Sequence, residues 1–445
     1  MSRLSAWLRR GLRALRNPLG GDSDADRTRS DLVLVGGLVV GVYVLFTVMA
    51  LLGPFDGVGN VLSQLETVTL LVLVYVMLAL ALNLQWGYAG LLNLGVAGFM
   101  AIGAYTMAML SAAPDATVPG LGLPLGVGIV GGFLAATLFG ALAALPAIRL
   151  RADYLAIVTL AFSEIIRLVV RSEAASEFTI AGQRLGTGGA STFPLPPNPV
   201  KVLLYENPGE PLVAAVDSPT VLGDLMLETA AVFNLSASQA ENILYTLLLL
   251  IPVGAFYLLL TRIGNSPFGR VLRAIREDEL VAGSLGKNTR RFKITTFAVG
   301  CGLMGLAAIL WQLQGQGRLS PGTFEPELTF FVFVALILGG SGSNTGSVVG
   351  GIVFAAVLLE GPRALKRVID ENFDISADPD TIIEASQGVE PLFAYLLSDS
   401  SIEALRFIML GVVLVYLMQR RPQGLLGHRR GQAATISLPT REDEP

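Results

Sequence analysis

Runs of apolar residues, several of them close to the length of a bilayer-spanning helix, follow one another along this chain. A helix that crosses the hydrocarbon core needs about 20 apolar residues. Charged residues make up 15% of the 445 residues, compared with about 25% in soluble proteins, so they are too few to cover a water-facing surface. The sequence therefore predicts an all-α polytopic membrane protein with about ten transmembrane helices. The expected spans are residues 31–52, 66–83, 88–110, 124–148, 153–170, 243–261, 293–313, 327–340, 346–360 and 403–418.

The positions of Lys and Arg set the expected orientation of these helices, because basic loops tend to stay in the cytoplasm. Residues 1–30 contain arginine and leucine at helical spacing, which is typical of an amphipathic helix on the cytoplasmic membrane surface. With this segment inside, ten spans also place Arg149 and the loop at 262–293 inside. The loops at 53–65 and 111–123, which contain no Lys or Arg, fall outside. We therefore expect both termini in the cytoplasm.

Two regions make this organisation less simple. The polar segments at 171–242 and 361–402 are acidic and are expected outside as insertions, although the second contains three basic residues in PRALKRV (362–368). The short runs within 327–360 flank the glycine-rich stretch GGSGSNTGSVVGG, and they are either full spans or re-entrant half-helices, which need protein or a cavity around them. The expected parts are a cytoplasmic segment at 1–30, a membrane domain at 31–425 and a disordered tail at 426–445.

The loop at 262–293 carries the most concentrated charge between two apolar runs. Ser266 followed by Pro267 predicts the start of a helix, and apolar residues then recur at three- and four-residue steps. Arginines lie on or beside the other face, and Glu277 is placed to pair with Arg273. Small residues near the end of the loop break the pattern. These features predict a short amphipathic helix and a turn at the membrane, although any basic cytoplasmic loop would share part of the pattern.

Polar side chains within the apolar runs form a second group of candidates. Asn83 and Asn93 need hydrogen-bond partners, because an unsatisfied amide in hydrocarbon is costly, and they either cap a helix break or line a substrate route. Glu164 and Arg167 can pair on one helix face, and an ionisable residue inside a membrane is a functional candidate. If the span ends near Glu164, both groups lie at the interface instead. Glycines spaced for close helix packing occur at Gly87, Gly90, Gly95, Gly98 and Gly103.

Several kinds of chemistry are disfavoured by the residue inventory. The chain has one cysteine, Cys301, and one histidine, His428, so an internal disulfide is impossible and a His/Cys metal site or a Ser-His-Asp triad in the membrane is nearly excluded. The glycine run at 338–350 lacks the Gly-Lys-Ser/Thr ending of a phosphate-binding loop, and no such motif occurs elsewhere. We expect no cofactor, no metal and no enzymatic activity. If ATP drives this protein, another polypeptide must hydrolyse it.

Three motifs in order resemble the branched-chain amino-acid permease family of ABC importers. The first is N-x-x-x-G-Y-A-G-x-x-x-L-G within 82–110, and the second is R-x-D-Y-L-A-I-V-T-L-x-F-x-E-I-I-R within 150–170. The third, G-R-x-x-x-A-I-R-E-x-E-x-x-A-x-x-x-G within 262–293, resembles the coupling loop of such permeases. LSPGTFEPELTF (319–330) and the glycine run follow in the family's order. The resemblance covers about residues 66–425 and is closer to the M-type (LivM-like) subunit than to its H-type companion.

The resemblance implies a multi-pass protein of the cell membrane, one of two permease subunits that form a path for leucine, isoleucine and valine. Its implied partners are two ABC ATPase subunits, an H-type permease subunit, an extracytoplasmic substrate-binding protein and the lipid bilayer, but no nucleic acid. The residues implied in ATPase coupling are Gly269, Arg270, Arg273, Ala274, Arg276, Glu277, Ala282 and Gly286. The candidates for the substrate path are Asn83, Asn93, Tyr105, Thr159 and Glu164.

Other functions stay open on the residues alone. Permeases for urea and short amides share these motifs, and no residue separates their substrates. An ion-coupled secondary transporter would need intramembrane carboxylates for coupling, and Glu164 is the only convincing one. An intramembrane enzyme acting on lipid would need clustered acids, histidines or a metal site, which the sequence does not show.

Overall fold

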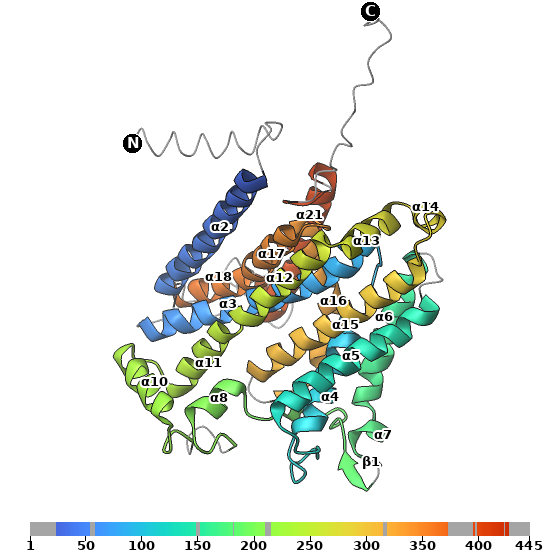
Figure 1. The fold of residues 1–445 in the computed structure, drawn as a ribbon. Coiled ribbons are helices and arrows are strands. Elements are labelled where there is room, and N and C mark those ends of the chain that lie inside the picture. Colours follow the sequence, from blue (N-terminus) through green and yellow to red (C-terminus); the bar gives the residue numbers. More distant parts are fainter. Residues whose placement is uncertain are drawn as a thin grey trace, which may run out of the picture. The chain divides into compact units, whose positions relative to one another are not determined.

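A computed structural model describes residues 24–53, 58–147, 152–180, 182–209, 215–314, 318–372, 395–396, 398–421 and 423–426. The chain divides into two compact units, Met1–Tyr43 and Val44–Pro445. The helix α2 (Asp24–Leu52) begins in the first unit and ends in the second, and all other described elements belong to the second unit (Figure 1). Most of the predicted N-terminal segment, most of the acidic stretch before α21 and nearly all of the predicted tail lie outside the described residues.

Two long, largely buried helices form the centre of the second unit. α3 (Val58–Leu82) continues through a π-helical turn, η1 (Asn83–Tyr88), and packs against α15 (Thr289–Gln314). α4 (Val96–Ser111) and α5 (Leu125–Ala147) pack against the same helix. Large apolar side chains of α5 stay exposed, which suits contact with lipid rather than with water.

Glycine allows α4 to approach its neighbours at backbone distance. A Cβ on Gly103 would lie 2.6 Å from the Cα of Gly305 in α15, and a Cβ on Gly132 of α5 would lie 2.5 Å from the carbonyl oxygen of Gly103. These contacts leave no space for side chains, as is common where membrane helices cross closely. The close packing predicted from the glycine spacing is confirmed at Gly103.

A first break in the bundle separates η1 from α4. The chain is irregular from Gly90 to Gly95, and Gly90 has a φ of 69°, a left-handed conformation that glycine adopts without strain. Because a residue in this conformation cannot continue a right-handed helix, the apolar run expected as one helix at 88–110 is interrupted. The predicted start of this span was wrong, since α4 begins at Val96.

A second break separates α16 (Pro326–Gly339) from α17 (Asn344–Ile352). α17 continues through a π-helical segment, η3 (Val353–Glu360), into α18 (Gly361–Asn372). The three together form one helix of 29 residues, long enough to cross a bilayer. The basic stretch at 362–368 therefore belongs to this helix, which continues to Asn372, past the expected end of the span at residue 360. That the segment at 361–402 is an insertion on the outer side stays a prediction.

Short elements gather at one end of the bundle. β1 (Phe178–Ile180) pairs antiparallel with β2 (Gln183–Leu185), and β3 (Phe193–Pro194) pairs with β4 (Arg318–Leu319). The other short elements are α7 (Glu173–Ser176), α8 (Pro199–Leu204), α10 (Val221–Val232) and η2 (Pro321–Phe324). Apart from these strands and one isolated bridge, the regular elements of the described chain are helices, as predicted.

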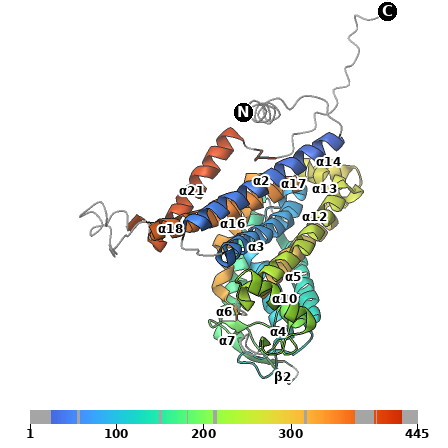
Figure 2. The same cartoon turned by 90° about the vertical axis from the view of Figure 1, so that its left-hand side faces the viewer.

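The loop helices lie at the other end. From α10 the chain runs through α11 (Ala237–Leu248) and α12 (Leu250–Asn265) to α13 (Pro267–Glu277) and α14 (Glu279–Ser284). α10 and the pair α13–α14 occupy opposite ends of the bundle in both views (Figures 1 and 2).

Six helices in the described residues are long and apolar enough to cross a membrane, and α4 and α16 are apolar but shorter. α6 (Ala152–Arg171) and α21 (Asp399–Arg420) occupy the two remaining expected spans. Each of the ten expected runs thus coincides largely with a helix. How many of them cross the bilayer, and on which side the termini lie, stay predictions.

Candidate functional site

α13 begins where the sequence predicts. The Ser266 hydroxyl accepts a hydrogen bond from the backbone N–H of Gly269 at 3.3 Å, and Pro267 occupies the first turn. Leu272 and Ile275 are buried, so the apolar face is turned toward the bundle. Gly269 is required here, because a Cβ would lie 2.4 Å from the carbonyl oxygen of Ile263. The predicted amphipathic helix is confirmed.

Two arginines of α13 fasten this helix to the bundle. Arg273 Nη2 donates to the carbonyl oxygen of Gly264 at 2.5 Å, and its guanidinium lies 5.5 Å from the centre of the Tyr88 ring. Arg276 Nη1 donates to the carbonyl oxygen of Gly87 in η1. The expected pairing of Arg273 with Glu277 was therefore wrong. The long side chain of Arg273 instead extends to the buried side of the helix, where it contacts Gly264 and Tyr88.

The next helix, α14, exposes apolar side chains. Asp278 accepts hydrogen bonds from the backbone N–H groups of Leu280 and Val281 at 2.9 and 3.0 Å and so caps its start. Leu280, Val281 and Leu285 are 83%, 55% and 72% exposed; we call these three residues the α14 patch. Gly286, with a φ of 75°, turns the chain toward α15. The turn predicted from the small residues thus follows a second short helix that the sequence reading did not foresee.

The remaining coupling candidates lie on α13, on α14 and in the turn that follows α14. Arg270, Ala274, Glu277 and Gly286 are exposed, whereas Ala282 is buried. Lys293 forms an ion pair with Glu279, which joins α15 to α14. The loop is therefore held on its buried side and presents an apolar patch with charged neighbours on its open side.

Asn83 lies at the start of η1 and connects η1 to the second break. Its Oδ1 accepts a hydrogen bond from the backbone N–H of Gly342 at 2.7 Å, and its Nδ2 donates to Asn344 Oδ1 at 3.1 Å. The Tyr88 hydroxyl donates to the same Asn344 oxygen at 2.9 Å, and Asn344 Nδ2 donates to Thr261 Oγ1 at 3.2 Å. Asn344 therefore joins η1, α12 and the start of α17. Sequence reasoning missed Asn344 because it lies in the glycine-rich run at 338–350, where no motif pointed to it.

Asn93 lies inside the first break and is fully buried. Its Oδ1 accepts from the backbone N–H of Gly95 at 2.9 Å, and its Nδ2 donates to Gln85 Oε1 at 2.9 Å. Gln85 donates in turn to the carbonyl oxygen of Phe297 in α15 at 2.8 Å. Of the two interpretations of Asn83 and Asn93, these contacts show that both side chains satisfy backbone groups at helix breaks.

Two threonines accept hydrogen bonds from further backbone N–H groups at the start of α4. Thr159 Oγ1 of α6 accepts from the backbone N–H of Leu94 at 2.9 Å, and Thr329 Oγ1 of α16 accepts from that of Ala97 at 3.1 Å. The first N–H groups of a helix have no partner within it, and here side chains from other helices supply partners. α4, α6 and α16 therefore meet at this break. Asn93 and Thr159 are thus brought together.

Tyr105 and Glu164 lie apart from the first break. The Tyr105 hydroxyl is buried without a hydrogen-bond partner among the described residues, and its ring lies 6.4 and 6.2 Å from those of Phe193 and Phe324. Glu164 accepts two hydrogen bonds from Arg167, at 2.5 and 2.9 Å, on the partly exposed face of α6. The predicted pairing of Glu164 with Arg167 forms.

The long apolar helices, with their exposed apolar faces, define a multi-pass membrane protein. The sequence profile of the family described as "Branched-chain amino acid transport system / permease component" matches residues 64–375, which is more than half of the chain. The chain belongs to this family of transport permeases, as the resemblance of its motifs implied.

Individual relatives agree with the M-type resemblance. The chain is 32% identical over 373 residues to the high-affinity branched-chain amino acid transport system permease protein LivM of Escherichia coli (strain K12), an alignment that covers 81% of this chain and 70% of the relative. It is 23% identical over 381 residues to a probable LivM of Methanocaldococcus jannaschii, covering 79% and 90%. The match to LivH of Salmonella typhimurium is 36% identical but spans 92 residues, 20% of this chain and 28% of LivH. No solved structure matches the chain.

Proposed function

We propose that this chain is a permease subunit of an ATP-driven importer for branched-chain amino acids, and that α13 and α14 dock a separate ATPase. The α14 patch carries the proposal. An exposed apolar patch rimmed by charged residues is typical of a protein contact, and this patch lies on a loop that resembles the coupling loop of such permeases. Because the sequence has no phosphate-binding motif, ATP hydrolysis is assigned to the partner.

Arg273 and Arg276 give the docked ATPase a mechanical connection to the bundle. Through them α13 is tied to the Gly264 and Gly87 carbonyl oxygens and to the Tyr88 ring. Tyr88 is hydrogen-bonded to Asn344 at the start of α17. A displacement of α13 would therefore move both the end of η1 and the second break. A flexible loop without these contacts would not transmit such a movement.

We place the substrate path beside the first break. Asn83, Asn93 and Thr159 are polar, buried and joined to helix ends that can separate. Farther along α4, Tyr105 would extend the path with a hydroxyl that has no partner among the described residues and lies in an otherwise apolar surrounding, which suits an aliphatic substrate with polar ends. Glu164 is left outside this path, because Arg167 already occupies both of its oxygens.

The partners follow from the same proposal. The relatives are named as LivM and LivH permease proteins of one kind of transport system, which supports pairing with an H-type subunit. Two ATPase subunits would bind at the α14 ends of the two permeases. The extracytoplasmic binding protein would reach the opposite end, where the short elements around α10 gather. The names of the relatives favour branched-chain amino acids over urea or short amides as the substrate.

Substitution of the α14 patch tests the docking site. Leu280→Asp places a charge within the patch, and we expect the ATPase to be lost from the purified complex together with ATP-driven leucine uptake, while the permease remains inserted. Val221→Asp is a matched control, because Val221 is 86% exposed on α10 at the opposite end and should leave ATPase binding unchanged.

Three results would contradict the proposed function in different ways. Retained ATPase binding in Leu280→Asp would remove α14 as the docking site. Leucine uptake that proceeds without any ATPase and follows an ion gradient would support a secondary transporter instead. ATP-driven uptake of urea or acetamide that leucine does not inhibit would correct the substrate.

A further inference from the structure

Glu66 is a carboxylate that neither the motifs nor the proposed coupling mechanism uses. It lies on α3, 22 residues before Tyr88, which corresponds to about 30 Å along a helix toward the end away from α13. Glu66 Oε1 accepts hydrogen bonds from Thr246 Oγ1 of α11 at 2.7 Å and from Gln314 Nε2 of α15 at 2.9 Å. Three helices therefore meet at this one oxygen.

The second oxygen of Glu66, Oε2, has no partner among the described residues, and the residue is partly exposed. Both groups that bind Oε1 are neutral, and no cationic side chain of the described residues forms an ion pair with Glu66. A carboxylate accepts through about four lone-pair sites, so capacity for donors remains. A charged group on a membrane helix is costly unless it is paired or faces a cavity, and for this reason such groups often mark a substrate route.

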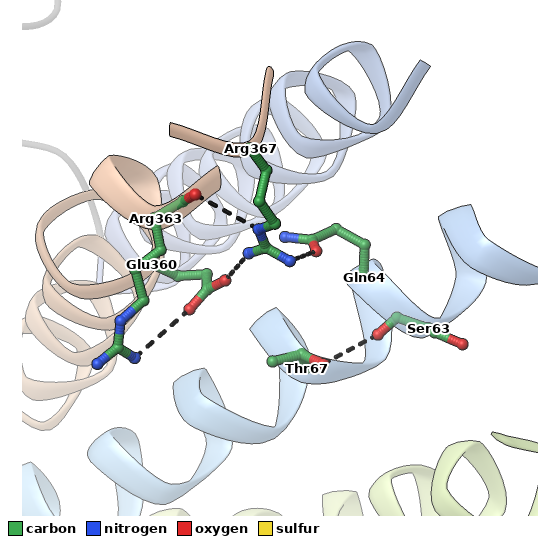
Figure 3. A network of polar contacts seen from close by, with 6 residues as sticks. All are labelled: Ser63, Gln64, Thr67, Glu360, Arg363 and Arg367. Carbon is green, nitrogen blue, oxygen red and sulfur yellow. Dashed lines mark hydrogen bonds and ion pairs between the residues drawn. The ribbon is translucent and has the colours of Figure 1, made fainter. Parts of the chain in front are cut away.

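A second carboxylate shows the usual arrangement for comparison. Glu360, almost fully buried at the end of η3, forms ion pairs with Arg367 and Arg363, and Arg367 also donates to Gln64 of α3 (Figure 3). Its charge is thus balanced within the chain by two cations. Glu66 lies two residues from Gln64 on the same helix, but no cation in the described part of the chain balances its charge in this way. The difference points to a cation that comes from outside the chain.

We propose that Glu66, held by Thr246 and Gln314, binds the ammonium group of the transported amino acid as it enters the permease from the end opposite α13. An ammonium group has three donors and no acceptor, which suits the open Oε2. This inference rests on the proposed import function and narrows it, because it assigns a substrate that carries a positive charge. Urea and simple amides are neutral and could not balance Glu66.

Glu66→Gln is the decisive variant, because it removes the charge while its amide oxygen still accepts from Thr246 and Gln314. In the complete complex in proteoliposomes, with loaded binding protein, we expect ATPase binding and basal ATP hydrolysis to be unchanged. Leucine uptake should fall at least about tenfold, since the loss of one partner of a desolvated charge pair typically has an effect of this size or more. Thr67→Val, on the next residue of α3, is the control and should keep uptake.

Thr246→Val separates recognition from helix packing. It keeps the Glu66 charge and removes one contact between helices, so a recognition role predicts that most uptake remains. If Glu66 only joins three helices, the order is reversed: Glu66→Gln keeps uptake and Thr246→Val loses it. Uptake at the wild-type level in Glu66→Gln, or loss of uptake in an inserted Thr246→Val protein, would overturn the inference. If Glu66→Gln is not recovered, Thr246→Val and Glu66→Asp take its place, because both keep the charge. Retained uptake in these two variants supports recognition, and lost uptake overturns it.

The two proposals fail in different ways. If the wild-type protein binds no ATPase and shows no ATP-driven leucine uptake, the proposed function is wrong. If the wild type does both and Glu66→Gln behaves in the same way, the importer assignment stands and only the role of Glu66 is removed.

Discussion

The contacts of Arg273 allow the coupling between α13 and the bundle to be tested by a single change, Arg273→Met. Methionine keeps much of the length and the apolar stem of arginine but loses the hydrogen bond to Gly264 and the charge above Tyr88. The variant leaves the exposed α14 patch untouched. It therefore perturbs the connection behind the proposed docking site and not the docking surface itself.

The size of the effect follows from the two contacts. A hydrogen bond from a charged group contributes about 1.5–3 kcal/mol, and a cation above an aromatic ring adds about 0.5–1 kcal/mol at exposed sites. Arg273 is partly exposed, so the lower values apply and the loss is about 2 kcal/mol. That loss corresponds to about a 30-fold change in the equilibrium between attached and detached α13.

The assay compares ATP hydrolysis with leucine uptake in proteoliposomes that contain the complete transporter. We expect Arg273→Met to bind the ATPase and hydrolyse ATP, but to import several-fold less leucine per ATP, because movement of a detached α13 no longer reaches η1. Arg262→Met, at an exposed position at the end of α12, should behave like the wild type. A wild-type ratio of leucine uptake to ATP hydrolysis in Arg273→Met would refute the role of Arg273 in connecting α13 to the bundle. Loss of the ATPase would show that Arg273 belongs to the docking surface.

Two further changes test the buried polar contacts. Asn93→Leu leaves the backbone N–H of Gly95 and the side-chain oxygen of Gln85 without their partner, at about 1–3 kcal/mol each, so the melting temperature of the purified protein in detergent should fall; an unchanged value would show that water replaces both bonds. Arg367→Leu leaves Glu360 with only the more distant Arg363. We expect the free energy of unfolding to fall by less than the roughly 3–5 kcal/mol that breaking a fully buried pair costs. Adding Glu360→Gln should then recover most of the melting temperature, and failure to recover would place the loss in packing instead of charge.

The long helix α17–η3–α18 contains the basic residues that disagreed with the expected orientation. Sequence reasoning treated the basic residues at 362–368 as an exception within an acidic loop. In the structure Arg367 reaches from this helix to Glu360 and Gln64 (Figure 3). At least one of these basic residues therefore serves an internal ion pair, and counting it as a free loop charge gives it too much weight in the orientation rule.

Patterns that arise from one stretch of chain were readable in the sequence. Apolar runs of helical length predicted the helices, because burying backbone polar groups in lipid leaves few alternatives. Ser266 and Pro267 predicted the start of α13, because a cap and a fixed φ act within one turn. The order of motifs indicated the family, which the match over residues 64–375 bears out.

Features that depend on residues distant in the sequence were decided by the tertiary structure alone. Arg273 could reach Glu277 or Gly264, and only the position of η1 selects Gly264 and Tyr88. In the sequence, Glu66 is only the first residue of the expected span at 66–83. The sequence does not show that Thr246 and Gln314, 180 and 248 positions away, bring donors to one of its oxygens, or that no cation among the described residues pairs with the other. A side chain's local pattern limits its helix and face, but its partners depend on how the helices pack, and those partners determine whether its charge is balanced within the chain or left for a ligand.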